Sequence, residues 1–321
     1  MNNVGGCIFI NYEDVLLSPE ISWDAVTTGI KMPQTLYKFQ SFIKADGTDN
    51  LHWSGNMEGQ FHMSLGCEFE DRNDCKPYFS KNSVLNYIDN FLRSLNVDYN
   101  TRDVILKGLM QILTDAYFNS VISNYQNKIR IGCFTDSSDN EKMWEKYAYD
   151  KTGYCIEYDT SKNKLFQLST LPILYCIHSY DCSFTLASSL ILESNRVGKN
   201  QTLEDNLEFF KPIYEKILKT AYIPLFIKQK RYWEFEREYR MFLLSHRNTR
   251  DGMLEASKYL DDNYNLDLAN AVNAIYLGEN FTTLTNSSEI LKKVICICKN
   301  KKIGLFQKTK KNGKIENVNI L

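Results

Sequence analysis

Apolar and charged side chains alternate along residues 231–244, where aromatic and large apolar residues recur with a period near two. This pattern predicts a β-strand, whose alternate side chains lie on opposite faces of a sheet. One face of the strand would then be mainly aromatic. The other face would carry a row of charges: Glu234, Glu236, Glu238 and Arg240.

The charged row allows two interpretations. It is either a solvated face, in which Arg240 pairs with Glu236 or Glu238 for less than about 1 kcal/mol, or a pair of catalytic carboxylates at the head of a buried strand. Spacing alone favours the solvated face. If the carboxylates lie in a cleft, they suit a substrate that develops positive charge.

Periodicity predicts the remaining elements. Apolar side chains repeat at three and four residues over two helical regions, 82–127 and 182–227. Short helices are expected at 140–149 and 287–293. Strands are expected at 36–39, 60–65, 129–134, 154–159, 172–177, 274–278, 294–298, about 303–309 and about 315–320.

Strands gather near both ends of the chain and helices fill the middle, which indicates an α+β fold with a mixed sheet. We expect an irregular N-terminal extension over residues 1–35 and a single elaborated domain over residues 36–321. The sequence Lys-Asn-Gly-Lys at 311–314 predicts a C-terminal β-hairpin. The lysines around this hairpin, Lys308 among them, either contact phosphates or protect a solvated sheet edge, and the second is favoured.

Composition narrows the possible partners. The chain has 38 Lys and Arg against 39 Asp and Glu, so its overall charge favours neither a polyanionic partner nor a membrane surface. No apolar run approaches about 18 residues and no signal segment is seen, so we expect a soluble cytoplasmic protein. The nine cysteines lie mostly in apolar runs, as reduced cysteines do. His62, Cys67 and Cys75 lack zinc-site spacing, and no metal site is predicted.

Seven short motifs follow one another between about residues 36 and 280. They are Tyr37–Phe39, Ser64–Asp74, Cys133–Thr135, Met143–Ala148, Gly153–Asp159, Trp233–Arg240 and Ile275–Gly278. As an ordered set, they resemble an uncharacterised bacterial family that is known only as a domain of unknown function. This resemblance by itself implies no reaction.

The Glu236-Arg237-Glu238 triplet at the head of an apolar strand is similar to the glutamate motif of mono-ADP-ribosyltransferases. The order of a glutamate strand and then an I-x-x-I strand is also similar to DNA-targeting toxins of that superfamily. The similarity implies an ADP-ribosyltransferase-like fold and an enzyme that consumes NAD. Glu238 would bind the ribose 2′-hydroxyl and oppose the developing charge, while Glu236 would orient or deprotonate the acceptor.

The same similarity implies further NAD contacts. Tyr37 or Lys38 would hold the adenosine or phosphate side, and Trp144 or Tyr147 would stack on a ring. Ser64 would be the one residue that remains of the superfamily's middle Ser-Thr-Ser motif. The implied NAD-binding residues are Tyr37, Lys38, Ser64, Trp144, Tyr147 and Arg240. Such an enzyme would act as a toxin or antiviral defence effector on a nucleic-acid or protein acceptor; the sequence leaves the oligomeric state open.

Two other classes of function stay open. A metal-dependent nuclease would use Asp71, Asp74, Glu157 and Asp159, although the chain has no E-x-K triplet. In a non-catalytic binding or regulatory module, the charged row would have a structural role alone. If Glu238 is catalytic, Glu238→Gln should abolish activity and leave the melting temperature almost unchanged.

Overall fold

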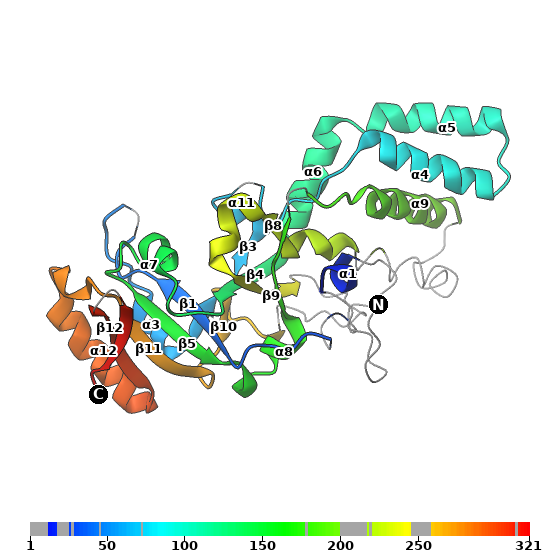
Figure 1. The fold of residues 1–321 in the computed structure, drawn as a ribbon. Coiled ribbons are helices and arrows are strands. Elements are labelled where there is room, and N and C mark those ends of the chain that lie inside the picture. Colours follow the sequence, from blue (N-terminus) through cyan, green and yellow to red (C-terminus); the bar gives the residue numbers. More distant parts are fainter. Residues whose placement is uncertain are drawn as a thin grey trace, which may run out of the picture. The chain divides into compact units, whose positions relative to one another are not determined.

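The computed structural model describes residues 12–17, 26, 29–44, 46–71, 73–176, 179–199, 217, 220–244, 258–311 and 314–321. The chain divides into two compact units, each assembled from three separate segments (Figure 1). Unit 1 comprises residues 1–30, 66–128 and 176–229. Unit 2 comprises residues 31–65, 129–175 and 230–321. The predicted helical regions both lie in unit 1.

Unit 1 is mainly helical. Its described elements are α1 (Tyr12–Leu17), η1 (Gly66–Glu68), α4 (Lys81–Ser94), α5 (Tyr99–Ile112), α6 (Asp115–Gln126), α9 (Ser183–Lys199), η4 (Ile223–Phe226) and β8 (Ile227–Gln229). α4 packs against both α5 and α9 (Figure 1). Their shared core is formed by Val84, Ile88, Leu113, Leu186 and Ala187. Much of the second predicted helical region, residues 200–216 and 218–219, lies outside the described residues.

The predicted helical region 82–127 is divided into three helices, because capping residues interrupt its apolar stripes. Ser80, Asp98 and Thr114 each accept a hydrogen bond from the backbone N–H three residues later. Such N-caps satisfy otherwise unpaired donors and begin a new helix. Thr114 therefore divides α5 from α6 within what the sequence presents as one stripe.

Unit 2 is built on a mixed sheet. Its strands are β1 (Thr35–Gln40), β3 (Ser64–Leu65), β4 (Ile129–Thr135), β5 (Tyr154–Asp159), β6 (Thr170–Pro172), β9 (Glu238–Leu244), β11 (Val272–Leu277), β12 (Gly304–Lys311) and β13 (Lys314–Asn319). They follow the order β13-β12-β11-β5-β1-β4-β9-β6, and β3 also pairs with β4. The β11–β12 pair is parallel and the other pairs are antiparallel. The predicted mixed sheet is thus confirmed, and so is the C-terminal hairpin.

Shorter elements complete unit 2: the strand pair β2 (Gln60–His62) and β10 (Asn265–Asp267), and the helices α3 (Trp53–Glu58), α7 (Glu141–Tyr147), η2 (Thr160–Lys162), α8 (Leu165–Ser169), α11 (Lys230–Trp233), η5 (Glu234–Glu236), η7 (Phe281–Thr283) and α12 (Ser287–Lys301). β7 (Leu174–Cys176) ends at the boundary between the units. α3 and α12 contribute to the main apolar core on one face of the sheet. α7 covers the other face with Met143 and Trp144.

The predicted strand over residues 231–244 is wrong in its first half. Residues 230–236 form α11 and η5, and β9 begins only at Glu238. Arg237 separates the two parts in a left-handed conformation with φ of 46°, which breaks regular pairing. Glu234 and Glu236 therefore do not belong to a strand face that continues to Glu238.

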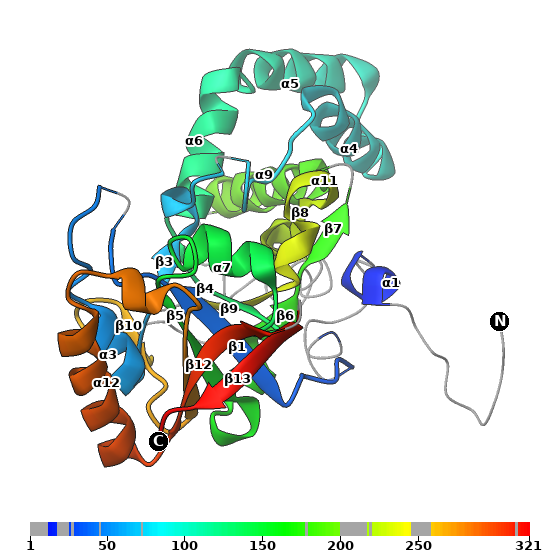
Figure 2. The ribbon, with the colours of Figure 1, turned by 60° about the vertical axis from the view of Figure 1, so that its left-hand side comes forward.

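The predicted strand at 294–298 is also wrong, because these residues continue α12. Ile290, Val294 and Cys298 are buried at a spacing of four, as one helical face requires. The parallel β11–β12 pair needs a crossover connection, and α12 supplies it (Figure 2). The apolar run Val-Ile-Cys-Ile-Cys fits either structure, so local alternation was misleading.

Candidate active site

Glu238 opens β9, and its backbone is fixed on both sides. It pairs with Thr135 at the end of β4. On the other side, its carbonyl accepts a hydrogen bond from the N–H of Ile173 at 2.8 Å, and its N–H donates to the Tyr175 hydroxyl at 2.8 Å. The Glu236–Glu238 triplet thus ends in a residue held firmly at the head of the strand.

The Glu238 side chain forms a buried ion pair with Arg240. Arg240 Nε lies 2.7 Å from Glu238 Oε1, and Arg240 Nη2 lies 3.2 Å from Oε2. The two residues are 4% and 0% exposed. Two parallel hydrogen bonds fix the carboxylate in one plane. Glu238 and Arg240 therefore form a desolvated ion pair. The interpretation of the charged row as a solvated face is wrong for these two residues.

Glu236 is 3% exposed in the turn before β9 and accepts a hydrogen bond from the Tyr147 hydroxyl of α7. Burial, and then the negative charge of Glu236, raise the pKa of Tyr147. Glu238 adds to the same effect. Tyr147 therefore stays a neutral hydrogen-bond donor to the carboxylate at neutral pH.

α7 and the turn before β9 are joined by several contacts besides this one. Asn140 caps α7 through the Met143 N–H and also donates a hydrogen bond to the carbonyl of Phe235. Lys146 Nζ lies 3.7 Å from the centroid of the Trp233 ring. Two motifs that lie about 90 residues apart in the sequence thus form one local structure.

A row of side chains crosses four adjacent strands on the sheet face that α7 covers. Glu238, Thr135, Tyr37 and Glu157 are paired in register on β9, β4, β1 and β5. With strands about 4.8 Å apart, the two carboxylates lie roughly 14 Å from each other. Between them, the Thr135 side chain is completely buried, and its hydroxyl has no hydrogen-bond partner among the described residues.

The Glu157 end of the row is also hydrogen-bonded. Asn273 Nδ2 lies 2.5 Å from Glu157 Oε1, and the Tyr276 hydroxyl lies 2.6 Å from Oε2. Tyr37 is half-buried beside them, and burial raises its pKa, to which Glu157 adds. These groups give the row a second polar centre.

The structure separates some of the predicted NAD-binding residues. Lys38 follows Tyr37 and therefore points to the opposite face of the sheet, where its Nζ lies 5.5 Å from the Phe61 ring centroid. Ser64 pairs with Ile131, four residues along β4 from Thr135 and so about 13 Å away. A single binding surface cannot use both Tyr37 and Lys38.

Trp144 lies beside the row but serves mainly as core. Its ring packs edge-on against Phe39 with centroids 4.9 Å apart, and its Nε1 donates to the carbonyl of Ser138 at 2.8 Å. It is 3% exposed. Cys133 pairs with Arg240 in the sheet, and burial raises the pKa of its thiol, so a reactive thiolate is not expected there.

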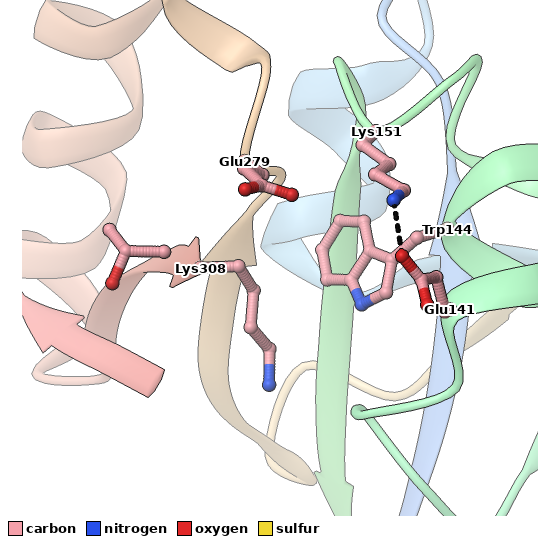
Figure 3. Close-up of a pocket in the computed structure, with 6 residues that line it drawn as sticks. Glu141, Trp144, Lys151, Glu279 and Lys308 are labelled. Atoms are coloured by element: carbon pink, nitrogen blue, oxygen red, sulfur yellow. Dashed lines mark hydrogen bonds and ion pairs between the residues drawn. The ribbon is translucent and has the colours of Figure 1, made fainter. Parts of the chain in front are cut away.

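Lys308 was expected at a solvated edge but is 3% exposed. Its Nζ lies 2.5 Å from Asp139 Oδ1, 3.1 Å from Ser138 Oγ and 4.9 Å from the Tyr276 ring centroid. It lines a pocket of about 280 Å³, including space open to solvent (Figure 3). The other lining residues are Glu141, Trp144, Lys151, Glu279 and Thr309.

The carboxylates considered for a nuclease have other contacts. Asp71 and Asp74 belong to unit 1, whereas Glu157 and Asp159 belong to unit 2. Asp159 caps η2 by accepting from the Ser161 N–H. Within the described ranges, no group of three or more His, Cys, Asp or Glu side chains could hold a metal ion. No helix in that same part of the chain is long and apolar enough to cross a membrane.

Residues 143–241 match a family model described as "Protein of unknown function (DUF2971)". This segment extends from α7 into β9, so it includes both parts of the Tyr147–Glu236 contact. The match confirms the resemblance to an uncharacterised domain-of-unknown-function family over this segment. No curated protein and no solved structure matches the chain.

Proposed function

We propose that unit 2 is an ADP-ribosyltransferase-like domain that consumes NAD, with Glu238 and Glu236 as its catalytic carboxylates. The observation that carries the proposal is the placement of both glutamates, almost completely buried, at the head of β9. Each carboxylate is held by a donor from the same unit, Arg240 or Tyr147. Their positions are therefore fixed before any substrate binds.

Cleavage of the bond between nicotinamide and ribose gives the sugar oxocarbenium character. A carboxylate fixed in a water-poor site stabilises such charge without having to reorganise. Glu238 supplies this carboxylate and accepts a hydrogen bond from the ribose 2′-hydroxyl. Glu236 accepts the proton of the attacking group. Tyr37, on the same face, contacts the adenosine or phosphate part of NAD.

The turn that carries Glu236 is the part that would have to move to admit NAD. At its end, the Arg237 side chain is 60% exposed and forms an ion pair, Nη2 to Asp136 Oδ2 at 2.6 Å. An exposed ion pair contributes little stability. The contacts of Asn140 and Tyr147 with the turn would also have to break, or α7 would have to move with it, before the row is exposed.

The test is incubation of the pure protein with NAD labelled on the adenylate, with and without DNA, RNA and cell lysate. We expect nicotinamide release or label transfer that is lost in Glu236→Gln. Glu234→Gln is the matched control, because Glu234 is exposed in the same turn. Circular dichroism of each variant separates loss of chemistry from loss of fold.

One observation favours a second function, a non-catalytic binding module. The Glu238–Arg240 pair is fully buried and neutral overall, as a structural ion pair would be. In that case the wild-type protein neither binds nor cleaves NAD, and Glu236→Gln changes stability alone. NAD turnover that survives in Glu236→Gln and in Glu238→Gln would exclude the catalytic assignment of both carboxylates.

A further inference from the structure

Helix α5 in unit 1 has two apolar faces. Leu106 and Leu109 pack with Leu113 into the core of unit 1. On another face, Val104, Ile105 and Ile112 are 69%, 38% and 56% exposed. None of the residues of α5 is buried. Positions i, i+4 and i+8 follow one side of a helix and position i+1 borders that side, so these three side chains form one exposed stripe that is interrupted at Gly108.

Gly108 lies at the centre of this stripe, and the fold of the chain does not require a glycine there. A Cβ at this position would meet nothing within 4 Å among the described residues, and the backbone has no positive φ there. Glycine inside a helix lowers helix stability relative to alanine. A glycine that costs stability and makes no close contact in its own chain is explained if another backbone approaches it.

We propose that this stripe is a self-association surface, on which α5 of one copy crosses α5 of a second copy in antiparallel orientation at Gly108. The spacing supports a second copy of this chain. Val104 and Ile112 are each four residues from Gly108. A two-fold axis through Gly108 therefore places Val104 of one copy against Ile112 of the other, and the reverse, as an isologous contact requires.

The chemistry of the stripe agrees with this occupant. The three stripe residues and Gly108 are uncharged, so no like charges meet on the axis and no acidic or basic partner is selected. Rows of side chains spaced by four interdigitate when two helices cross at about −50°. Glycine at the crossing point allows the closest approach of the two axes.

The size of the surface predicts a weak dimer. α5 has 14 residues and is therefore about 21 Å long. One helix of this length offers less than the ~800 Å² per partner of a standard stable interface. Self-association should thus be transient and depend on protein concentration.

Sedimentation velocity of the full chain, from micromolar to near-millimolar concentration, tests the proposal. The wild type should shift reversibly from monomer to dimer. Gly108→Lys should stay monomeric over the same range, and Gly108→Ala should associate more weakly while its melting temperature is unchanged or higher. A wild type that is monomeric throughout, or a Gly108→Lys variant that dimerises equally, would overturn the proposal.

Cross-linking tests the two-fold axis itself. Under mild oxidation, Gly108→Cys should give a covalent dimer joined at residue 108, identified by peptide mass spectrometry. Met110→Cys is the matched control, because Met110 is 50% exposed on a different side of the same helix. Equal dimer yields from both variants, or yield from Met110→Cys alone, would refute this arrangement. The cross-linked peptides have to be identified because the native cysteines that the structure describes are free and could also form disulfides.

Discussion

Replacement of Glu238 by glutamine removes one partner of the most deeply buried ion pair described in unit 2. Arg240 is 0% exposed and directs Nε and Nη2 at the Glu238 carboxylate. The neutral amide removes the negative charge that Glu238 presents to the buried guanidinium. Breaking a buried pair from one side costs about 3–5 kcal/mol. A typical domain has about 5–15 kcal/mol of total stability, so we expect a large loss.

Urea unfolding followed by tryptophan fluorescence measures this loss. Trp53, Trp144 and Trp233, three of the four tryptophans, belong to unit 2. The transition midpoint of Glu238→Gln should fall well below that of the wild type. This expectation replaces the one drawn from sequence, in which a catalytic Glu238 left the melting temperature almost unchanged.

A double variant separates the charge imbalance from the loss of packing. Glu238→Gln combined with Arg240→Met removes both charges and keeps similar volumes. Such replacements of buried pairs are often neutral or stabilising, so the double variant should recover most of the stability. A loss below about 1 kcal/mol in Glu238→Gln, or a double variant less stable than the single one, would refute this account of the pair.

Three further changes probe the sheet face and its supports. Tyr147→Phe removes one hydrogen bond from buried Glu236 and should destabilise unit 2 by about 1–3 kcal/mol in urea unfolding. Tyr276 has a pKa raised by burial and by Glu157, so its stability contribution is present below pH ~10 and is lost as pH rises beyond it. The part of the tyrosinate absorbance that Tyr276→Phe removes should appear only with unfolding, whereas the exposed tyrosines ionise in the native protein. Gly278→Ala brings a Cβ within 2.0 Å of the Lys151 carbonyl oxygen and should lower the melting temperature by several degrees.

Each of these changes has a control in the chain. Tyr149→Phe alters a tyrosine that is 44% exposed and should leave stability within about 0.5 kcal/mol. Tyrosinate absorbance that rises in full while circular dichroism stays native would contradict the assignment for Tyr276. Gly108→Ala adds a Cβ in open space, so a loss of stability there as large as in Gly278→Ala would contradict the steric argument.

Local sequence patterns predicted the central strands of the sheet and the C-terminal hairpin. β4 and β5 were recognised because most of their residues are apolar and buried, and the hairpin was recognised from its Asn-Gly sequence. Such patterns could not place Glu234–Glu236, where a left-handed Arg237 ends the alternation. They also could not distinguish a buried helix from a strand at 294–298.

The site depends on contacts between residues far apart in the sequence. The pairing of Glu238 with Arg240 was foreseeable, because residues two apart share a strand face. The Tyr147–Glu236 hydrogen bond joins residues 89 positions apart, and only the packing of α7 on the sheet brings them together. The alternation of β1 already implied that Tyr37 and Lys38 face opposite ways. The burial of Lys308 had no local signal.

The assembly of each unit from separate segments has a consequence for synthesis on the ribosome. β4 lies between β1 and β9 in the sheet, yet more than 100 residues of chain separate β4 from β9. Domains usually fold as units once their sequence has emerged, and β4 must wait for β9 before it has both neighbours in the sheet. The row from Glu238 to Glu157 therefore cannot form on a nascent chain until β9 has left the ribosome, and any activity of this face begins only after that point.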